Sequence, residues 1–213
     1  MTQMKYILVL VCCLASFSAF SIKKSALKAG DLIFQDLDCG GMCDAIEAVT
    51  EGYHNRDFSH MGMVSIMPNG KYYVLESIGK GVQETDLDEF LKRSTHPHLV
   101  ARMKKPYRKL IPAAVAFCQK WVGSAYDDEF IYNNGKYYCS ELIYDAFKAA
   151  NDGQPLFQLY PMTYKDPATG SFYPVWESYF HNLKVNIPEG LPGCNPGGMS
   201  TSDKVKVLGD LES

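Results

Sequence analysis

The fold is decided by one stretch of sequence, YYCSELIYDAFKAAN, which spans residues 137–151. It follows the polar turn Asn133-Asn134-Gly135 and is closed by Gly153. Between these turns, apolar residues recur at the spacing of one helix face, which predicts a single amphipathic helix. The residues of this apolar stripe are Leu142, Ile143, Ala146, Phe147 and Ala150. Cys139 therefore lies at the predicted start of the helix.

A cysteine at the start of a helix faces the positive end of the helix dipole and unpaired backbone N–H groups, which favour the thiolate. The same N–H groups can stabilise the oxyanion that forms when the sulfur attacks a carbonyl. Cys139 is therefore a candidate nucleophile. The alternative is a small buried residue of the stripe, because Cys139 precedes Leu142 and Ile143 by three and four residues.

A thiolate nucleophile needs a base, and His60 has the best setting of the five histidines. It opens HMGMVSIM, a strand-like run that is followed by Pro68-Asn69-Gly70 and then by a second run, KYYVLESI. Two such runs around a strong turn signal predict a β-hairpin. Gly62, two residues after His60, would give an approaching backbone room.

The length of the hairpin loop decides whether Glu76 can orient His60. A two-residue Asn69-Gly70 loop would place Glu76 on the face opposite His60. A three-residue loop with Gly70 in the left-handed position pairs Gly62 with Glu76, so that His60 and Glu76 share one face as diagonal neighbours. A carboxylate there would fix the tautomer and orientation of the imidazole. The alternative for Glu76 is a solvent-facing strand residue.

Other segments complete a mixed pattern of helices and strands. Strands are predicted in GDLIFQ at residues 30–35 and in HLVARM at residues 98–103, and a short helix after Thr85-Asp86. Asp44 with Glu47 predicts the start of a helix near residues 42–53. A second apolar stripe over residues 110–121 predicts a helix in which Cys118 fills the core.

The composition predicts one globular domain. The chain has 213 residues, of which 46% are hydrophobic, and a formal net charge of −3. This length is sufficient for one buried core, which we place in residues 22–213. The mildly acidic balance offers no basic surface for phosphate backbones, so a nucleic-acid partner is not expected.

The first residues predict export. An apolar run begins at Tyr6, passes into small residues and ends before the pair Lys23-Lys24, which is typical of a signal peptide over residues 1–21. We expect a periplasmic or secreted protein with no integral membrane span once this segment is removed. A lipoprotein signal at Cys12 or Cys13 stays open as an alternative.

Five cysteines follow the predicted signal, and any disulfide among Cys39, Cys43, Cys118 and Cys194 is left open. A zinc site is a competing interpretation. The spacing of Cys39, Cys43, His54 and His60 is close to a zinc-ligand pattern, although the interval between the two pairs is two residues short. G-x-S-x-G, P-loop and dinucleotide glycine motifs are absent from the sequence.

The segments GDLIF, FSHMGMV, YVLES and YYCSELIYDAF, in this order, resemble the circularly permuted NlpC-type cysteine hydrolases, specifically their YiiX-like branch. The resemblance implies an α+β, permuted papain-like fold in which an antiparallel sheet packs against a cysteine-bearing helix. It also implies Cys139 as nucleophile, His60 as base and Glu76 as the residue that orients the base. By the same resemblance, Tyr126 lies near the oxyanion site.

These expectations describe an exported cysteine hydrolase that cleaves an amide or ester bond through a thioester acyl-enzyme. The substrate would be a small molecule, lipid or peptide: a cell-wall peptide, a lipid amide or a small amino-acyl conjugate. Neither a cofactor nor a metal ion is expected. The alternative is a non-catalytic module that binds an acyl or peptide ligand on the same fold.

Overall fold

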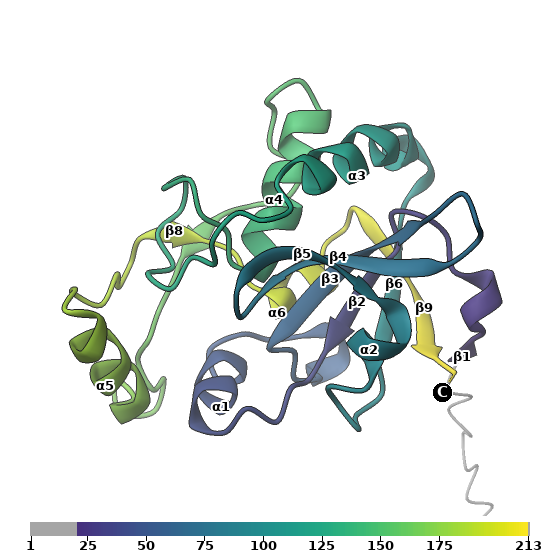
Figure 1. The fold of residues 1–213 in the computed structure, drawn as a ribbon. Helices are drawn as coiled ribbons and strands as arrows, with labels where there is room; N and C mark the ends of the chain where they lie inside the picture. Colours follow the sequence, from purple (N-terminus) through teal and green to yellow (C-terminus); the bar gives the residue numbers. More distant parts are fainter. Residues whose placement is uncertain (1–20, 213) are drawn as a thin grey trace, which may run out of the picture.

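The computed structural model describes residues 21–212, and its framework is a seven-stranded sheet (Figure 1). The strands lie in the order β1-β9-β6-β2-β3-β4-β5, and all neighbours are antiparallel except the parallel edge pair β1 and β9. A separate two-stranded sheet pairs β7 with β8. The strand bounds are β1 Ser21–Ile22, β2 Leu32–Gln35, β3 His60–Ile66, β4 Tyr72–Ile78, β5 Gly81–Asp86, β6 Leu99–Met103, β7 Tyr160–Pro161, β8 Pro192–Gly193 and β9 Val205–Leu211.

Helices cover both faces of this sheet. The helices α3 and α4 pack against each other and against β3 and β4, whereas α2 contacts β4 and β5 from the other side (Figure 1). The helix α5 lies away from the sheet and contacts α1. The α-helix bounds are α1 Gly41–Glu47, α2 Leu87–Leu91, α3 Ile111–Lys120, α4 Cys139–Ala150, α5 Pro174–Leu183 and α6 Pro196–Ser200, and the 3-10 helices are η1 Lys24–Ala26, η2 Tyr53–Asn55 and η3 Lys105–Leu110.

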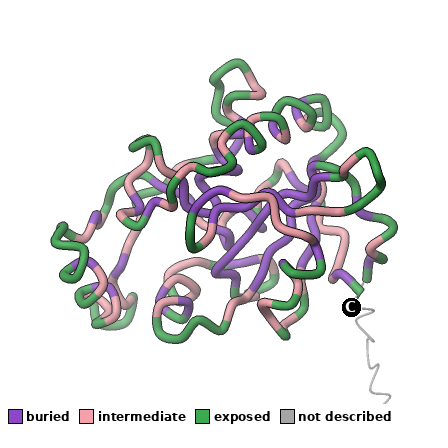
Figure 2. The backbone as a smooth tube through the Cα atoms, viewed as in Figure 1, coloured by how far each residue is buried: buried purple, intermediate pink, exposed green. Residues whose placement is uncertain are grey.

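The alternation of side chains along β3 and β4 divides the core in two. Met61, Met63 and Leu75 face the larger cluster, which also contains the apolar stripe of α4. Val64 and Val74 face the smaller cluster, which includes Leu87 and Phe90 of α2. The central strands are therefore buried on both faces (Figure 2). The predicted antiparallel sheet and the cysteine-bearing helix α4 are confirmed, and the fold is α+β.

The hairpin of β3 and β4 has the three-residue loop, the one of the two alternatives that places His60 and Glu76 on one face. Met63 lies opposite Leu75 and Val64 opposite Val74, and Gly70 has a φ of 81°, in the left-handed region that this loop requires. Gly62 leaves room for the neighbouring strand, because a Cβ there would lie 2.3 Å from Val74 Cγ1. This register places His60 and Glu76 on the same face.

The helix predicted near residues 42–53 is shorter than expected and begins elsewhere. Its N-cap is Gly40 rather than Asp44, and α1 ends at Glu47. The prediction of a capping box at Asp44 was therefore wrong: the disulfide between Cys39 and Cys43 encloses the turn at Gly40, so the helix starts before Asp44.

The predicted signal peptide lies outside the described residues, apart from Ser21 in β1. Within residues 21–212, every helix is too short or too polar to cross a membrane.

Candidate active site

The site begins with a buried pair formed by His60 and Glu76. His60 is the first residue of β3, and Glu76 lies on the adjacent strand β4. His60 Nε2 is 2.6 Å from Glu76 Oε2, and the two residues are 3% and 0% exposed. Since Nε2 is engaged by the carboxylate, Nδ1 is the ring nitrogen that remains for a reaction partner.

Glu76 is held by donors on three elements. Gln83 and Thr85 of β5 donate to Glu76 Oε1, and Arg93, just after α2, donates to Oε2 at 2.7 Å. Burial by itself would raise the pKa of Glu76, but the hydrogen bonds from His60, Arg93 and Thr85 lower it to about 2. The carboxylate is therefore charged at neutral pH.

Cys139 is the first residue of α4, as predicted, and is 7% exposed. Although α4 packs on the face opposite His60, His60 lies at the end of its strand, where the tip of the helix reaches it. Burial lowers the pKa of His60, but hydrogen bonds to Cys139 and Glu76, together with their negative charges, raise it to about 9. The position of His60 between the Cys139 sulfur and the Glu76 carboxylate thus favours the protonated imidazole.

Tyr126 lies with Cys139 in the wall of a cleft of about 250 Å³. The backbones of Tyr126 and Tyr137 form a β-bridge, which holds Tyr126 beside the residues that lead into α4. Burial, followed by the negative charge of Cys139, raises the pKa of Tyr126 well above its ordinary value. The hydroxyl therefore keeps its proton and can donate a hydrogen bond. The structure brings together all four residues that the sequence singled out.

Sequence reasoning missed the residues that fix Glu76, namely Gln83, Thr85 and Arg93. A signal for two of them was present, because Gly79-Lys80 is a two-residue turn that pairs Glu76 with Gln83 and puts Thr85 on the same face. Arg93 had no local signal, since it reaches Glu76 from the segment after α2.

A second missed feature ties the segment around Cys194 to the start of α4. The Tyr138 hydroxyl accepts a hydrogen bond from Cys194 N at 3.1 Å, and Ser140 Oγ donates to Cys194 O at 3.0 Å. Tyr138 and Ser140 flank Cys139 in the chain. Two hydrogen bonds therefore hold the backbone on either side of Cys139 against the segment that precedes α6.

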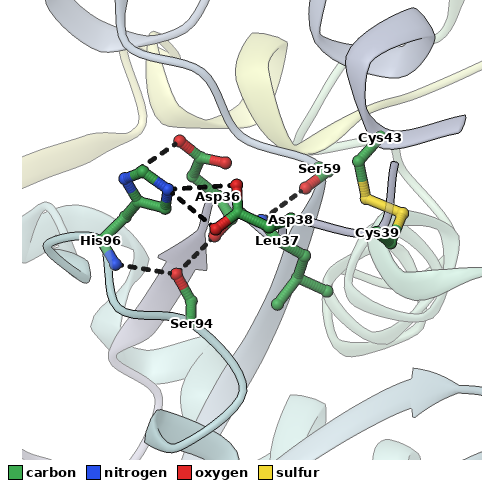
Figure 3. The surroundings of a disulfide bond; sticks show 8 residues. All are labelled: Asp36, Leu37, Asp38, Cys39, Cys43, Ser59, Ser94 and His96. Carbon is green, nitrogen blue, oxygen red and sulfur yellow. Dashed lines mark hydrogen bonds and ion pairs between the residues drawn. A yellow bond between two sulfur atoms is a disulfide. The ribbon is translucent and has the colours of Figure 1, made fainter. Parts of the chain in front are cut away.

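The zinc interpretation is overturned. Cys39 and Cys43 form a disulfide, so neither offers a thiolate ligand, and the ring of His60 is bonded to Glu76 (Figure 3 shows the disulfide). Within residues 21–212, the cysteines outside this disulfide are Cys118, Cys139 and Cys194, which are all buried. Cys118 fills the core, as predicted.

A different group of side chains near the disulfide offers ligand types that a cation accepts: Asp36, Asp38 and His96, with one donor atom from each within 4.8 Å of the others (Figure 3). The hydrogen bond of His96 to Asp38 and the charge of Asp36 raise its pKa. The two ring nitrogens of His96 already face the carboxylates, Nδ1 toward Asp36 and Nε2 toward Asp38, and these contacts account for the arrangement.

A helix-tip cysteine on a sheet that carries histidine and an acid, with the histidine strand preceding the cysteine helix, defines the class of permuted papain-like proteins. The family model described as "Permuted papain-like amidase enzyme, YaeF/YiiX, C92 family" matches residues 26–209. The chain belongs to this family, as its sequence motifs predicted. Family membership supports a cysteine hydrolase in general.

Two relatives agree with this assignment. The protein YiiX of Escherichia coli (strain K12) is 28% identical over 153 residues, which is 69% of each chain. A crystal structure described as "metalloprotein yiiX from Escherichia coli O157:H7" superposes with a TM-score of 0.69 at 21% sequence identity. The superposition covers 86% of this chain and 97% of the chain in that crystal structure. At 21% identity the likeness shows the fold alone.

Proposed function

We propose that the protein is a cysteine hydrolase that cleaves an amide or ester through a thioester acyl-enzyme. The observation that carries the proposal is the fully buried contact of 2.6 Å between His60 and Glu76, made beside a cysteine at the start of a helix. Burying an ionised carboxylate against an imidazole is unfavourable unless both are paired. Active sites are where such arrangements recur.

In the first step, the Cys139 thiolate attacks the carbonyl carbon of the substrate and forms a C–S bond. His60 gives its Nδ1 proton to the leaving nitrogen or oxygen as the C–N or C–O bond breaks. Glu76 keeps the ring oriented and stabilises its charge before the transfer.

In the second step, water attacks the carbonyl carbon of the thioester. His60, now neutral, takes a proton from this water, and the C–S bond breaks to restore the Cys139 thiolate. The acyl group leaves as a carboxylic acid. In both steps, the Tyr126 hydroxyl and the backbone N–H groups of the first turn of α4 supply donors for the oxyanion. The mechanism uses side chains of this chain and water.

The test is a comparison of Cys139→Ala and Cys118→Ala with the native protein. Hydrolysis of activated aryl esters and amides should fall by at least about a thousandfold in Cys139→Ala. It should persist in Cys118→Ala, because Cys118 lies in the core away from the cleft. Circular dichroism and thermal melts establish that both variants are folded.

Alkylation provides an independent readout. Burial raises the pKa values of Cys118 and Cys194 far above the ordinary range, so these two remain thiols at neutral pH. A single iodoacetamide adduct on Cys139, found by intact mass and peptide mapping, is the expected result. A Cys139 that resists alkylation in a folded protein without hydrolytic activity would favour the non-catalytic binding module.

We also propose that the protein is exported, with residues 1–21 as its signal peptide and the periplasm or the outside as its destination. The disulfide between Cys39 and Cys43 supports this, because disulfides persist in oxidising compartments. Fractionation of producing cells followed by intact mass should find a mature chain that begins after Ser18 or Ser21. A full-length chain in the cytosolic fraction would contradict export.

A further inference from the structure

The cleft that contains Cys139 has an apolar wall contributed by segments far apart in the sequence. Ile46 and Val49 come from α1 and the turn after it, Phe130 from the loop before α4, Met162 from the segment after β7, and Trp176 from α5. The cavity has a volume of about 250 Å³, below the range of about 300 to 1,000 Å³ for drug-sized ligands. Its size suits one ring or a short chain.

The position of the two reacting side chains tells which half of a substrate enters this cleft. Among the described residues, those that line the cleft include Cys139 but not His60. The leaving group must lie beside His60 to receive its proton, whereas the acyl group stays bonded to the Cys139 sulfur. The acyl side of the substrate therefore occupies the cleft.

Two buried donors in the same wall lack partners. Tyr164 and Trp176 are each 2% exposed, and neither Tyr164 Oη nor Trp176 Nε1 has a hydrogen-bond partner within residues 21–212. Their rings lie 5.1 Å apart, edge to face. Buried polar groups are normally satisfied, so such orphans at a cleft call for an acceptor from outside the chain. The acceptor would be neutral rather than anionic, because most of the lining side chains are apolar or aromatic and the acids Asp127 and Glu189 lie near Tyr164.

The backbone at Phe130 is a further sign that the cleft is built for a ligand. Phe130 has a φ of 53°, a left-handed conformation that is unfavourable for an aromatic residue. The buried Asp127 holds this loop, accepting from the backbone N–H groups of Glu129 and Ile131 and from the Asn134 side chain. The loop thus keeps the Phe130 ring in the wall despite its strained backbone.

The neighbouring cavity limits the length of the acyl group. It has a volume of about 560 Å³ and shares Cys194 and Asn195 with the cleft, but its wall carries Asp203 and Lys204. A long alkyl chain that left the cleft would meet these charged groups.

On the basis of the proposed function, we propose that the cleft is the acyl-binding pocket. The pocket selects a short apolar acyl group that bears one neutral hydrogen-bond acceptor. This places the substrate among small apolar acyl amides or esters, and apart from long-chain lipids and from charged peptides. Phe130 and Trp176 set the shape of the pocket, and the Tyr164 hydroxyl and Trp176 indole bind the acceptor.

The first experiment compares p-nitrophenyl esters that share one leaving group and differ in the acyl group: acetyl, phenylacetyl, dodecanoyl and succinyl. We expect kcat/KM for phenylacetyl to exceed that for acetyl and for succinyl by about tenfold or more, because the ring is buried without a charge. Dodecanoyl should be poorer than phenylacetyl. Hydrolysis that depends on Cys139 but ranks succinyl or dodecanoyl first would overturn the pocket while leaving the hydrolase standing.

The second experiment isolates the two donors with matched acyl groups, 4-oxopentanoyl and 4-methylpentanoyl, which differ by a ketone oxygen in place of a methyl group. Tyr164→Phe and Trp176→Phe keep a ring and remove a donor. Each variant should lower the ratio of kcat/KM for the 4-oxopentanoyl ester to kcat/KM for the 4-methylpentanoyl ester by about three- to tenfold. General damage to the wall would change both rates together. A ratio unchanged in both variants would refute acceptor recognition, whereas the absence of turnover and of Cys139 alkylation in the native protein would instead reject the proposed function.

Discussion

His60 carries its proton at neutral pH because Cys139 and Glu76 lie on either side of its ring. Its folded-state pKa of about 9 lies above the ordinary value of 6.5, so the charged imidazole is lost as pH rises through about 9. The proposed reaction should therefore lose kcat/KM on an alkaline limb near pH 9. Glu76→Gln removes the negative charge of the carboxylate beside His60 and should move this limb toward lower pH, with kcat/KM reduced about 10- to 100-fold at neutral pH.

The check on this prediction is a pH profile of kcat/KM for an activated ester, corrected for the variant's folded fraction. Glu89→Gln is a suitable control, because it makes the same change at an exposed carboxylate that pairs with Lys92 rather than with His60. An alkaline limb at the same pH in Glu76→Gln and in the native protein would show that Glu76 does not act on His60.

Arg93 acts on stability through Glu76. Because the pKa of Glu76 is lowered from 4.5 to about 2, its contribution to stability is present above pH 4.5 and is lost as pH falls through about 2. Arg93→Met deprives the buried carboxylate of a donor, so Glu76 should take up a proton at higher pH and acid unfolding should begin earlier. At neutral pH the variant should lose about 1–3 kcal/mol of unfolding free energy. Denaturant melts at pH 3 to 7 measure the unfolding free energy and the pH at which acid unfolding begins. Acid unfolding at the same pH in Arg93→Met and in the native protein would contradict the prediction.

At the scale of elements, the hairpin was predictable and the surroundings of the site were not. Period-2 alternation and Gly70 are local signals, so residue spacing predicts the hairpin and narrows its register to two loop lengths, one of which joins His60 to Glu76. The apolar stripe likewise predicts that α4 starts at Cys139. The approach of Arg93 and Trp176 depends on packing between segments distant in sequence, for which residue spacing carries no information. The disulfide joins cysteines only four residues apart, but that spacing fitted a zinc site as well.

Within α4, Glu141 places a buried acid in the first turn. It is 0% exposed and accepts from Asn133 N and, at 3.4 Å, from Tyr138 N, which links the preceding loop to the helix. Burial, followed by the charge of Asp127 among other causes, raises the pKa of Glu141 to about 8. A raised acid pKa makes the native state bind more protons than the unfolded state, so stability should fall as pH rises from 4.5 to 8.

Glu141→Gln tests this element directly. Glutamine does not ionise, and its oxygen can accept the shorter bond from Asn133 N, although its Nε2 cannot accept the 3.4 Å bond from Tyr138 N. The variant should therefore lose less stability over this pH range. The gain relative to the native protein should reach at least about 1 kcal/mol at pH 9, since one pKa unit corresponds to about 1.4 kcal/mol. Urea melts at pH 5 and 9 give the comparison, and equal pH slopes for both proteins would argue against a buried titrating Glu141.

For the whole molecule, the sheet depends on an ion pair remote from the cleft. Arg102 of β6 binds Asp31, just before β2, through both carboxylate oxygens, with Nε–Oδ1 and Nη2–Oδ2 distances of 2.7 and 2.8 Å. Asp31 is 1% exposed and bonds the Lys28 backbone as well. It lies opposite Val64, toward the far end of β3 from His60. The pair thus joins the strands that carry the site to the β6 and β9 half of the sheet.

Arg102→Met should leave a buried carboxylate unpaired and destabilise the fold by about 3–5 kcal/mol. For a domain of this size, that corresponds to a melting temperature lower by about 6–20 °C. Because the pair is remote from Cys139, kcat/KM per folded molecule should stay unchanged at a temperature where both proteins are native. The double variant Asp31→Leu/Arg102→Met removes the orphaned charge and should recover much of the loss. A melting temperature unchanged in Arg102→Met, or no recovery in the double variant, would show that the sheet does not depend on this pair.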